Sequence, residues 1–208
     1  MVGIRNLSFR LLACMACAAF LTSCSATSAT PHSTPEPALT PASGMVLIDG
    51  YQFLITAVED LGVTGIAPEV DIDTYRLTVD GLVGNPLVLG YDDISRYPMF
   101  SEAAILDCPG VFTDVAEWTG VPVSTLLEEA HVGPQATQVS FYAIDGYQRT
   151  FPLAEVLRDG VFLALKVNGQ ILPKEHGYPL RLVMEGKEGN NWIKWVNHIE
   201  LKQSEAEF

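Results

Sequence analysis

The residue in this sequence best suited to chemistry is Cys108, within "ILDCPGVFTDVAEWTGVPV" (105–123). The other three of the four cysteines all lie in the first 24 residues, so Cys108 is the only thiol in the part of the chain that looks folded. A solitary thiol can pack as a small inert hydrophobe, act as a nucleophile beside a histidine, or bind a soft transition metal. The histidines available to it are His131, His176 and His198.

The surroundings of Cys108 favour two of these three uses. No sequence typical of a catalytic cysteine flanks it. A lone thiolate could still hold a metal if a cofactor supplied the remaining donors. Inert packing and metal ligation therefore both stay open on the residue types alone.

The first residues predict export. Arg5 and Arg10 precede an apolar run that ends in Leu-Thr-Ser-Cys, which reads as a lipobox with Cys24 as the lipidated residue. We therefore expect residues 1–23 to be a lipoprotein signal peptide, because the apolar run is short for a membrane span of roughly 20 residues. An uncleaved N-terminal anchor is the alternative. Both readings place the rest of the chain in the cell envelope, outside the cytoplasm and tethered to a membrane.

Composition divides the remainder into a spacer and one domain. Residues 24–45 are rich in Ser, Thr, Ala and Pro, which predicts a flexible linker. Residues 46–208 fit a single domain of ordinary size. Without the signal peptide the chain has 10 basic and 25 acidic residues, which argues against nucleic acid as a partner. Eight of those ten basic residues lie in 149–208, so an anionic ligand should be held there.

The elements that must position Cys108 are mainly short strands. Alternating or apolar runs predict strands at 75–81, 85–90, 102–108, 137–147, 161–169, 178–186 and 192–202. Short helices are expected at 91–98, at 121–133 with Leu126 and Leu127 facing inward, and at 152–160. The fold class is therefore α+β, with a strand-rich mixed sheet or barrel-like core and short helices.

One longer pattern carries a resemblance. The segment "NGQILPKEHGYPLRLVMEGKEGNNWIKWV" (168–196), together with the Cys108 region and "WTGVPVSTLL" (118–127), resembles the molybdopterin-binding domain of the sulfite oxidase family. That family includes sulfite oxidases, plant-type nitrate reductases and periplasmic methionine-sulfoxide reductase catalytic subunits. The similarity runs in order through most of residues 75–202, and it implies the sulfite-oxidase-type fold and a molybdenum-molybdopterin cofactor.

The resemblance also implies roles for particular residues. Cys108 matches the single protein thiolate on molybdenum. His176 and Arg181 match residues that contact the pterin and its phosphate, and Asp145 lies where the family often has a polar pterin contact. The run that would bind the pterin through backbone atoms and a lysine is Trp192, Ile193 and Lys194.

The sequence departs from the family in places. The stretch "EDLGVTGIAPEVD" (59–71) lacks the side chains with which larger members wrap the pterin, so that contact should be absent or made by backbone. The charged residues near Cys108 in the sequence are acidic, and no obvious cation lies among them to bind an oxyanion substrate. This argues against sulfite or nitrate as the substrate. Tyr147 and Arg149 are the nearest candidates for the missing active-site side chains.

Two function classes follow. The first is a minimal molybdenum oxidoreductase that performs two-electron chemistry of the oxygen-atom-transfer type on a small molecule. It would pass electrons to a separate partner, because the sequence has no C-x-x-C-H haem motif and too few cysteines for an iron–sulfur cluster. The second is a non-catalytic, ligand-binding lipoprotein that keeps the fold, since function lives in the site. The substrate and the redox direction are open at this stage.

Overall fold

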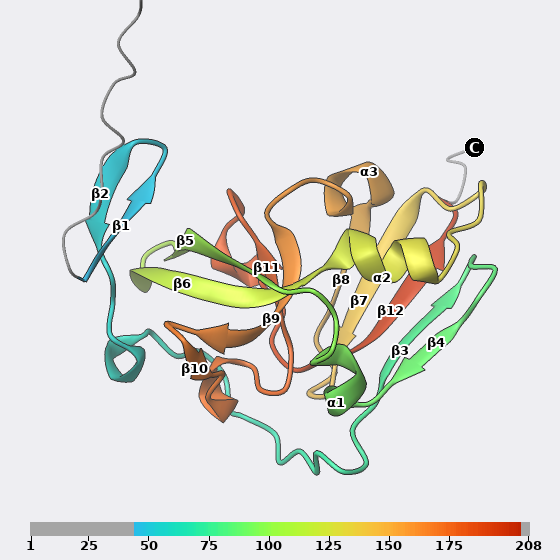
Figure 1. Ribbon diagram of the computed structural model, residues 1–208, viewed down its shortest axis with the longest axis horizontal. Helices are drawn as coiled ribbons and strands as arrows, with labels where there is room; N and C mark the ends of the chain where they lie inside the picture. The colour runs from blue at the N-terminus through green and yellow to red at the C-terminus, as the bar shows by residue number, and fades with distance from the viewer. Residues whose placement is uncertain (1–43, 205–208) are drawn as a thin grey trace, which may run out of the picture. The chain divides into compact units, whose positions relative to one another are not determined.

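The computed structural model describes residues 44–204, coloured from blue to red in Figure 1. The expected signal peptide, Cys24 and nearly all of the expected linker lie outside these residues. Within 44–204 strands predominate and the helices are short, as the α+β prediction requires. None of the helices in this range is long and apolar enough to cross a membrane.

The first sheet carries Cys108. Its strands run in the order β10-β9-β6-β5. Strand β10 pairs with the C-terminal end of β9, and β11 pairs with the N-terminal part of β9. All of these pairings are antiparallel. The strands are β5 (Phe100–Cys108), β6 (Phe112–Pro122), β9 (Val161–Val167), β10 (Gln170–Ile171) and β11 (Arg181–Met184).

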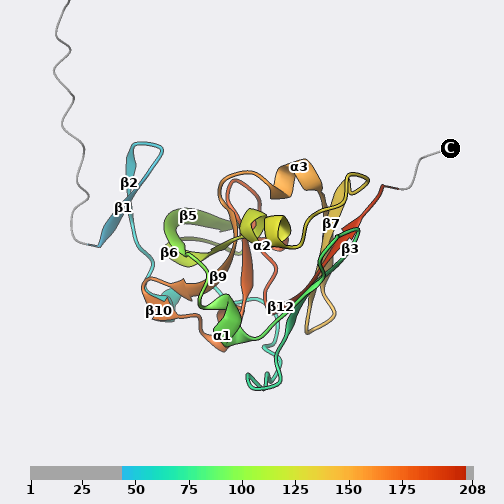
Figure 2. The same ribbon diagram turned by 45° about the vertical axis from the view of Figure 1, so that its right-hand side comes forward.

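The second sheet lies across the core from the first, and Figures 1 and 2 both show β5, β6 and β9 on one side and β3, β7 and β12 on the other. Its order is β4-β3-β12-β7-β8, in which β12 and β3 are parallel. The strands are β3 (Leu77–Gly81), β4 (Leu87–Leu89), β7 (Gln138–Ala143), β8 (Gln148–Pro152) and β12 (Val196–Lys202).

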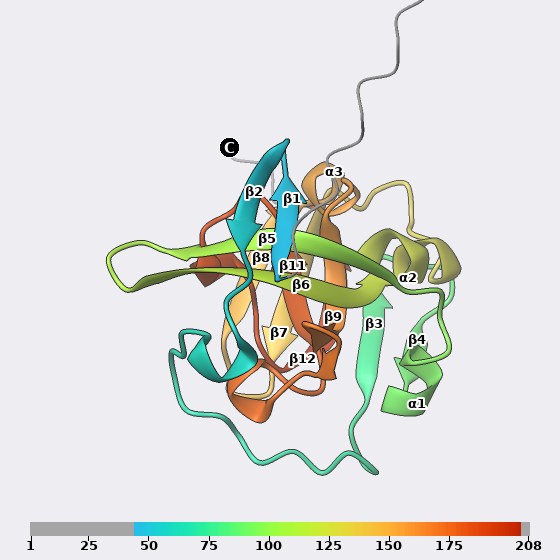
Figure 3. The same ribbon diagram turned by 60° about the vertical axis from the view of Figure 1, so that its left-hand side comes forward.

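A hairpin and several short helices complete the described part. Strands β1 (Met45–Ile48) and β2 (Tyr51–Leu54) form the hairpin, which stands in front of β5 and β6 in Figure 3. The α-helices are α1 (Tyr91–Ile94), α2 (Val123–Glu129) and α3 (Leu153–Val156). The 3-10 helices are η1 (Val58–Asp60), η2 (Lys174–His176) and η3 (Gly189–Asn191).

One apolar core joins the two sheets and α2. It includes Trp118 and Phe162 from the first sheet and Phe141 from the second, each at most 1% exposed. Leu126 and Leu127 of α2 are buried in it, as the sequence predicted. Burying such side chains is the main stabilising contribution to a fold of this kind.

Several boundaries differ from the sequence expectations. Helix α2 ends at Glu129 rather than near Gly133, because His131 takes a left-handed φ of 54° that no helix can continue. The last predicted strand begins only at Val196, since Trp195 also has a positive φ, of 57°. Strands β1, β2, β6, β8 and β10 were not expected. The run of β1 is apolar throughout and that of β6 contains two acids, whereas β2, β8 and β10 are too short to show a clear alternation.

Candidate functional site

Strand pairing puts Cys108 on the core-facing side of the first sheet. Cys108 pairs with Phe112, and two residues back Leu106 pairs with Asp114. Side chains two apart on a strand share a face. Because Leu106 and Asp114 are both buried, the half-exposed Cys108 thiol lies at the open end of the same inward face. The thiol is free among the described residues.

The thiol packs directly against η3. A Cβ atom added to Gly189 would collide with the Cys108 sulfur, and it would also lie 3.0 Å from a Leu106 methyl group. A glycine at 189 is therefore what lets η3 approach the end of β5 this closely. Burial raises the pKa of the Cys108 thiol, and the positive charge of Arg181 acts in the opposite direction.

Arg181 is the buried cation of the site. It begins β11 and is 4% exposed, with its guanidinium 5.1 Å from the centre of the Trp118 ring and 5.8 Å from that of Trp192. One Nη donates to the carbonyl of His176 at 3.1 Å, whereas the buried Nε has no partner among the described atoms. Burial lowers the pKa of Arg181 to about 10, so it stays charged at neutral pH.

Lys194 is the second cation, and it too has no carboxylate partner within ion-pair distance in residues 44–204. Its Nζ donates to the backbone carbonyls of Thr64 and, at 3.0 Å, Glu175, and it lies 4.5 Å from the centre of the Trp195 ring. Burial, followed by the positive charge of Arg181, lowers the pKa of Lys194 to about 8. The site thus holds two cations without an ion-pair partner among the described residues, on which Asp114, Asp145 and Glu175 act only from farther away.

Gly177 allows these two cations to lie on neighbouring segments. Its φ is 113°, and a Cβ there would lie 3.1 Å from the Cβ of Arg181 and 3.2 Å from the Cα of Lys194. Any other residue would force these segments apart. His176, just before it, is buried, and burial together with both cations lowers its pKa, so its imidazole is neutral at pH 7.

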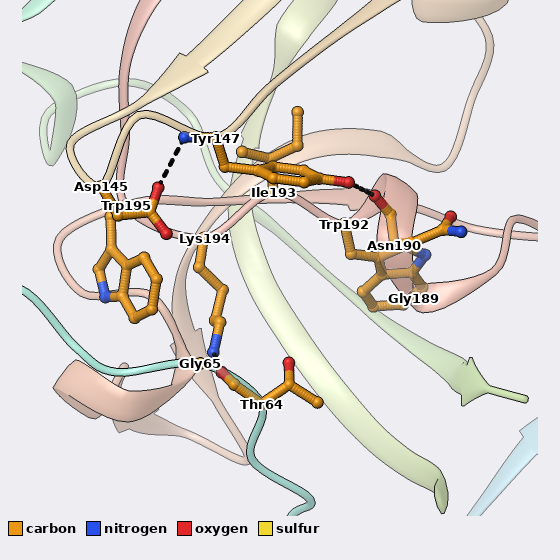
Figure 4. A pocket seen from close by; sticks show the side chains of 10 residues that line it. All are labelled: Thr64, Gly65, Asp145, Tyr147, Gly189, Asn190, Trp192, Ile193, Lys194 and Trp195. Atoms are coloured by element: carbon orange, nitrogen blue, oxygen red, sulfur yellow. Dashed lines mark hydrogen bonds between the residues drawn. The ribbon is translucent and has the colours of Figure 1, made fainter. Parts of the chain in front are cut away.

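A cavity of about 280 Å³ opens beside this cluster (Figure 4). It is lined by Thr64, Gly65, Asp145, Tyr147, Gly189, Asn190, Trp192, Ile193, Lys194 and Trp195. The Tyr147 hydroxyl donates to the Asn190 carbonyl at 2.8 Å and accepts from Arg149 Nε at 3.0 Å, which ties the β7–β8 turn to η3.

The residues present fit an anionic metal cofactor. Two cations without acid partners are expensive to bury unless an anion joins them. An orphaned Arg181 Nε and a lysine suit a phosphate, and the neighbouring thiol suits a soft metal. No group of three or more His, Cys, Asp or Glu side chains in 44–204 is placed to hold a metal ion. A metal at Cys108 would therefore take its other donors from the cofactor.

Comparison with known proteins identifies the family. The sequence profile of the oxidoreductase molybdopterin binding domain matches residues 64–207. Mitochondrial sulfite oxidase of Macaca fascicularis is 30% identical over 169 positions, covering 67% of this chain and 31% of the relative. The protein-methionine-sulfoxide reductase catalytic subunit MsrP of Gluconobacter oxydans is 32% identical over 149 positions, covering 63% of this chain and 48% of the relative.

A solved structure agrees with the sequence relatives. The sulfane dehydrogenase SoxCD from Paracoccus pantotrophus superposes with a TM-score of 0.68 at 28% identity, over 86% of this chain and 57% of that one. The chain therefore belongs to the oxidoreductase molybdopterin binding domain family, with the sulfite-oxidase-type fold and a molybdenum-molybdopterin cofactor. It spans about a third of the length of the sulfite oxidases it matches.

The structure brings the expected site residues into one region in two groups. Asp145, Tyr147, Trp192, Ile193 and Lys194 line the cavity itself. The others lie beside it: Cys108 against Gly189, Arg149 on Tyr147, Arg181 against the Trp118 and Trp192 rings, and His176 bonded to Arg181 through its carbonyl.

Sequence reasoning missed several parts of the site. It found no cation near Cys108, whereas Arg181, 73 positions later in the numbering, is close enough to lower the pKa of the thiol. It also missed Thr64 and Gly65, whose segment lines the cavity, and the Thr64 carbonyl accepts a bond from Lys194. The stretch 59–71 therefore reaches the cavity through its backbone. The only sequence signal for Gly189 was the glycine in "EGNNW".

Substituting alanine at Gly189 should displace the Cys108 sulfur. In cofactor-free protein we expect Gly189→Ala to change the rate at which Ellman's reagent modifies the thiol, and in loaded protein to lower the ratio of molybdenum to pterin by roughly half or more. Gly90→Ala, at a glycine whose added Cβ meets nothing closer than 3.4 Å, is the matched control. Unchanged thiol reactivity in Gly189→Ala would contradict the close packing.

Lys194 should make the stability of the cofactor-free protein depend on pH. Its folded pKa of about 8 lies below the ordinary value of 10.5. Between these pH values the unfolded chain holds a proton that the folded chain has lost, so the Lys194 contribution makes the free energy of unfolding rise with pH. Urea unfolding at about pH 7.5 and about pH 10 should show wild type gaining stability relative to Lys194→Met. The control variant Lys174→Met, at an exposed lysine, should show the same change in the free energy of unfolding between the two pH values as wild type. If the free energies of unfolding of wild type and Lys194→Met differ by the same amount at both pH values, the shifted pKa is refuted.

Proposed function

We propose that the chain is a membrane-tethered, extracytoplasmic molybdenum oxidoreductase, in which Cys108 ligates the metal and the reaction is a two-electron change of the oxygen-atom-transfer type. The observation that carries the proposal is the meeting of one free thiol with two cations that lack acid partners. This donor set suits a molybdenum whose other sulfur ligands and phosphate come from the pterin. The names of the relatives include a sulfite oxidase and a methionine-sulfoxide reductase.

Each residue would have a distinct task. The bound cofactor supplies the two-electron redox chemistry. Cys108 loses its Sγ proton when it ligates the metal, and the nearby Arg181 charge favours the resulting thiolate. Arg181 and Lys194 hold the phosphate by charge-assisted hydrogen bonds. His176 is neutral, so its imidazole can donate one hydrogen bond and accept another without adding charge.

The walls of the cavity would orient the cofactor and the substrate. Trp192 and Trp118 exclude water from Arg181, which strengthens its hold on an anion. Tyr147 lines the cavity and is exposed, and Arg149 donates to its hydroxyl, so we place the contact with a small-molecule substrate at these two side chains. Electrons would pass to a separate partner.

Attachment to a membrane rests on the sequence of the first 24 residues. Replacing Cys24 by serine should move the protein from the membrane fraction to the soluble extracytoplasmic fraction. Retention of Cys24→Ser in membranes would instead favour an uncleaved N-terminal anchor.

The decisive test of the function is cofactor content. The full chain would be produced in a host that makes molybdopterin, and molybdenum and pterin would be measured beside a loaded control enzyme. We expect near-stoichiometric amounts of both. A well-folded protein with neither would sink the enzyme proposal and leave a ligand-binding lipoprotein on the same fold.

A further inference from the structure

A second concave surface lies on the opposite face of β5 from the Cys108 thiol, because its lining residues Ile105 and Asp107 alternate along the strand with Leu106 and Cys108. It is a groove of about 310 Å³ between the end of β1 and the turn at residues 185–188. Its apolar residues are Ile48 and Ile105, and its carboxylates are Asp49, Asp107, Glu185 and Glu188. We call it the hairpin groove. Asp107 precedes Cys108 in the chain, and Glu188 precedes the Gly189 that contacts the thiol.

Within residues 44–204 the carboxylates of the hairpin groove have no basic partner, and Glu185 shares a hydrogen bond with the Glu102 side chain. None of the four forms an ion pair there, and Asp107 accepts only from the Thr113 hydroxyl, at 2.8 Å. The one lysine of the groove, Lys187, is turned to Glu155 at 2.5 Å. The groove therefore presents concentrated negative charge, and a positively charged partner would be attracted to it.

The hairpin beside the groove is apolar on both faces. Val46 and Ile48 share one face, and Val46 is 9% exposed where β1 lies against β5. Met45, Leu47 and Leu54 share the opposite face, on which Leu54 is 69% exposed. Tyr51, at the turn, is 72% exposed. An apolar centre beside charged residues is the usual anatomy of a protein interface.

We infer that the hairpin groove and the outward face of the β1–β2 hairpin together dock a basic electron-carrying protein. The charge of the groove selects a cationic partner. A second copy of this strongly acidic chain, or a membrane rich in anionic lipid, would be repelled. Docking here would bring the carrier against Asp107 and Glu188, the chain neighbours of the metal-binding thiol and of its packing glycine. This inference rests on the proposed function, because a carrier is needed only if the site exchanges electrons.

The test measures binding of cytochrome c, a small basic haem protein, to the full chain by isothermal titration calorimetry. We expect micromolar to millimolar affinity that weakens about tenfold or more between about 0.02 and 0.2 M salt. Asp49→Asn with Glu188→Gln should weaken binding about fivefold or more at low salt. Asn suits the left-handed φ of 50° at Asp49, so this variant keeps the turn.

Two further variants separate a built surface from general charge attraction. Asp92→Asn with Glu128→Gln removes the same charge from exposed positions on α1 and α2, and its affinity should stay within about twofold of wild type. Leu54→Ser should weaken binding about threefold at both salt concentrations, because apolar contacts are not screened by salt. Equal losses from the groove and control variants would overturn the inference, as would no loss from either.

The remaining outcomes address the other possible occupants and the proposed function. Sedimentation of the same protein tests self-association, and vesicles of neutral and anionic lipid test membrane binding by the Cys24→Ser variant. Leu54-dependent dimers or vesicle binding, without binding of cytochrome c, would overturn the inference. Molybdenum and pterin are measured on the same preparation. If the protein contains molybdenum and pterin but shows no groove-dependent binding of cytochrome c, only the docking surface is overturned. If well-folded protein contains neither molybdenum nor pterin, the proposed function is overturned, and the assignment of an electron carrier is overturned with it.

Discussion

Replacing Cys108 with serine should strongly lower the proposed oxidoreductase activity while leaving the pterin bound. The serine oxygen is a harder ligand than the thiolate, so molybdenum should be lost or its spectrum altered. We expect activity to fall by on the order of 100-fold or more, since even losing an outer-shell partner of a metal commonly costs 10–100-fold. The pterin should stay, because Arg181, Lys194 and the cavity walls do not depend on the sulfur.

The control for this substitution lies on the same hairpin. Val111 is 68% exposed, so Val111→Ser tests whether a small polar change between β5 and β6 disturbs the site. Both variants should unfold within about 1 kcal/mol of wild type, because neither side chain is fully buried. Full activity and an unchanged metal spectrum in Cys108→Ser would show that the sulfur is not a ligand and that inert packing is its role.

Replacing Arg181 with methionine should have opposite effects on binding and on stability. Losing its charge-assisted hydrogen bonds should weaken cofactor binding by about 100-fold, at 1.5–3 kcal/mol for each such bond. The cofactor-free protein should become more stable by about 1–3 kcal/mol, because a buried charge without an acid partner disappears. Methionine has a similar length, and its sulfur packs well between Trp118 and Trp192.

The measurements are pterin content after purification and urea unfolding of protein from a host that lacks the cofactor. Arg96→Met is the matched control, because the Arg96 side chain is 73% exposed and, within residues 44–204, forms an ion pair only with Asp93. Arg181→Lys keeps the charge, and it should retain part of the binding if the variant folds. Undiminished pterin in Arg181→Met, or a cofactor-free variant clearly less stable than wild type, would contradict an anion-binding role.

Much of the fold could be predicted from local patterns. The alternation in 75–81 and the apolar run in 161–169 became β3 and β9, and Leu126 and Leu127 are buried as their spacing indicated. The misses have physical causes. Strand β6 contains Asp114 and Glu117, which hide its alternation, and Asp114 is acceptable on the inward face because Gly62 N–H donates to it at 2.7 Å.

The sequence by itself determined the family, the fold class and the residue types of the site. It could do so because the pattern from 168 to 196 and the solitary Cys108 can be recognised without knowing which residues meet in the folded chain. Only the tertiary structure decided which charges act on the thiol. Arg181 and Lys194 reach the end of β5 because Gly177 lets their segments pass closely and Gly189 lets η3 touch the sulfur. Tertiary structure also placed Thr64 at the cavity and Asp49 beside Asp107. Such contacts join residues far apart in the chain, so no spacing within the sequence reveals them.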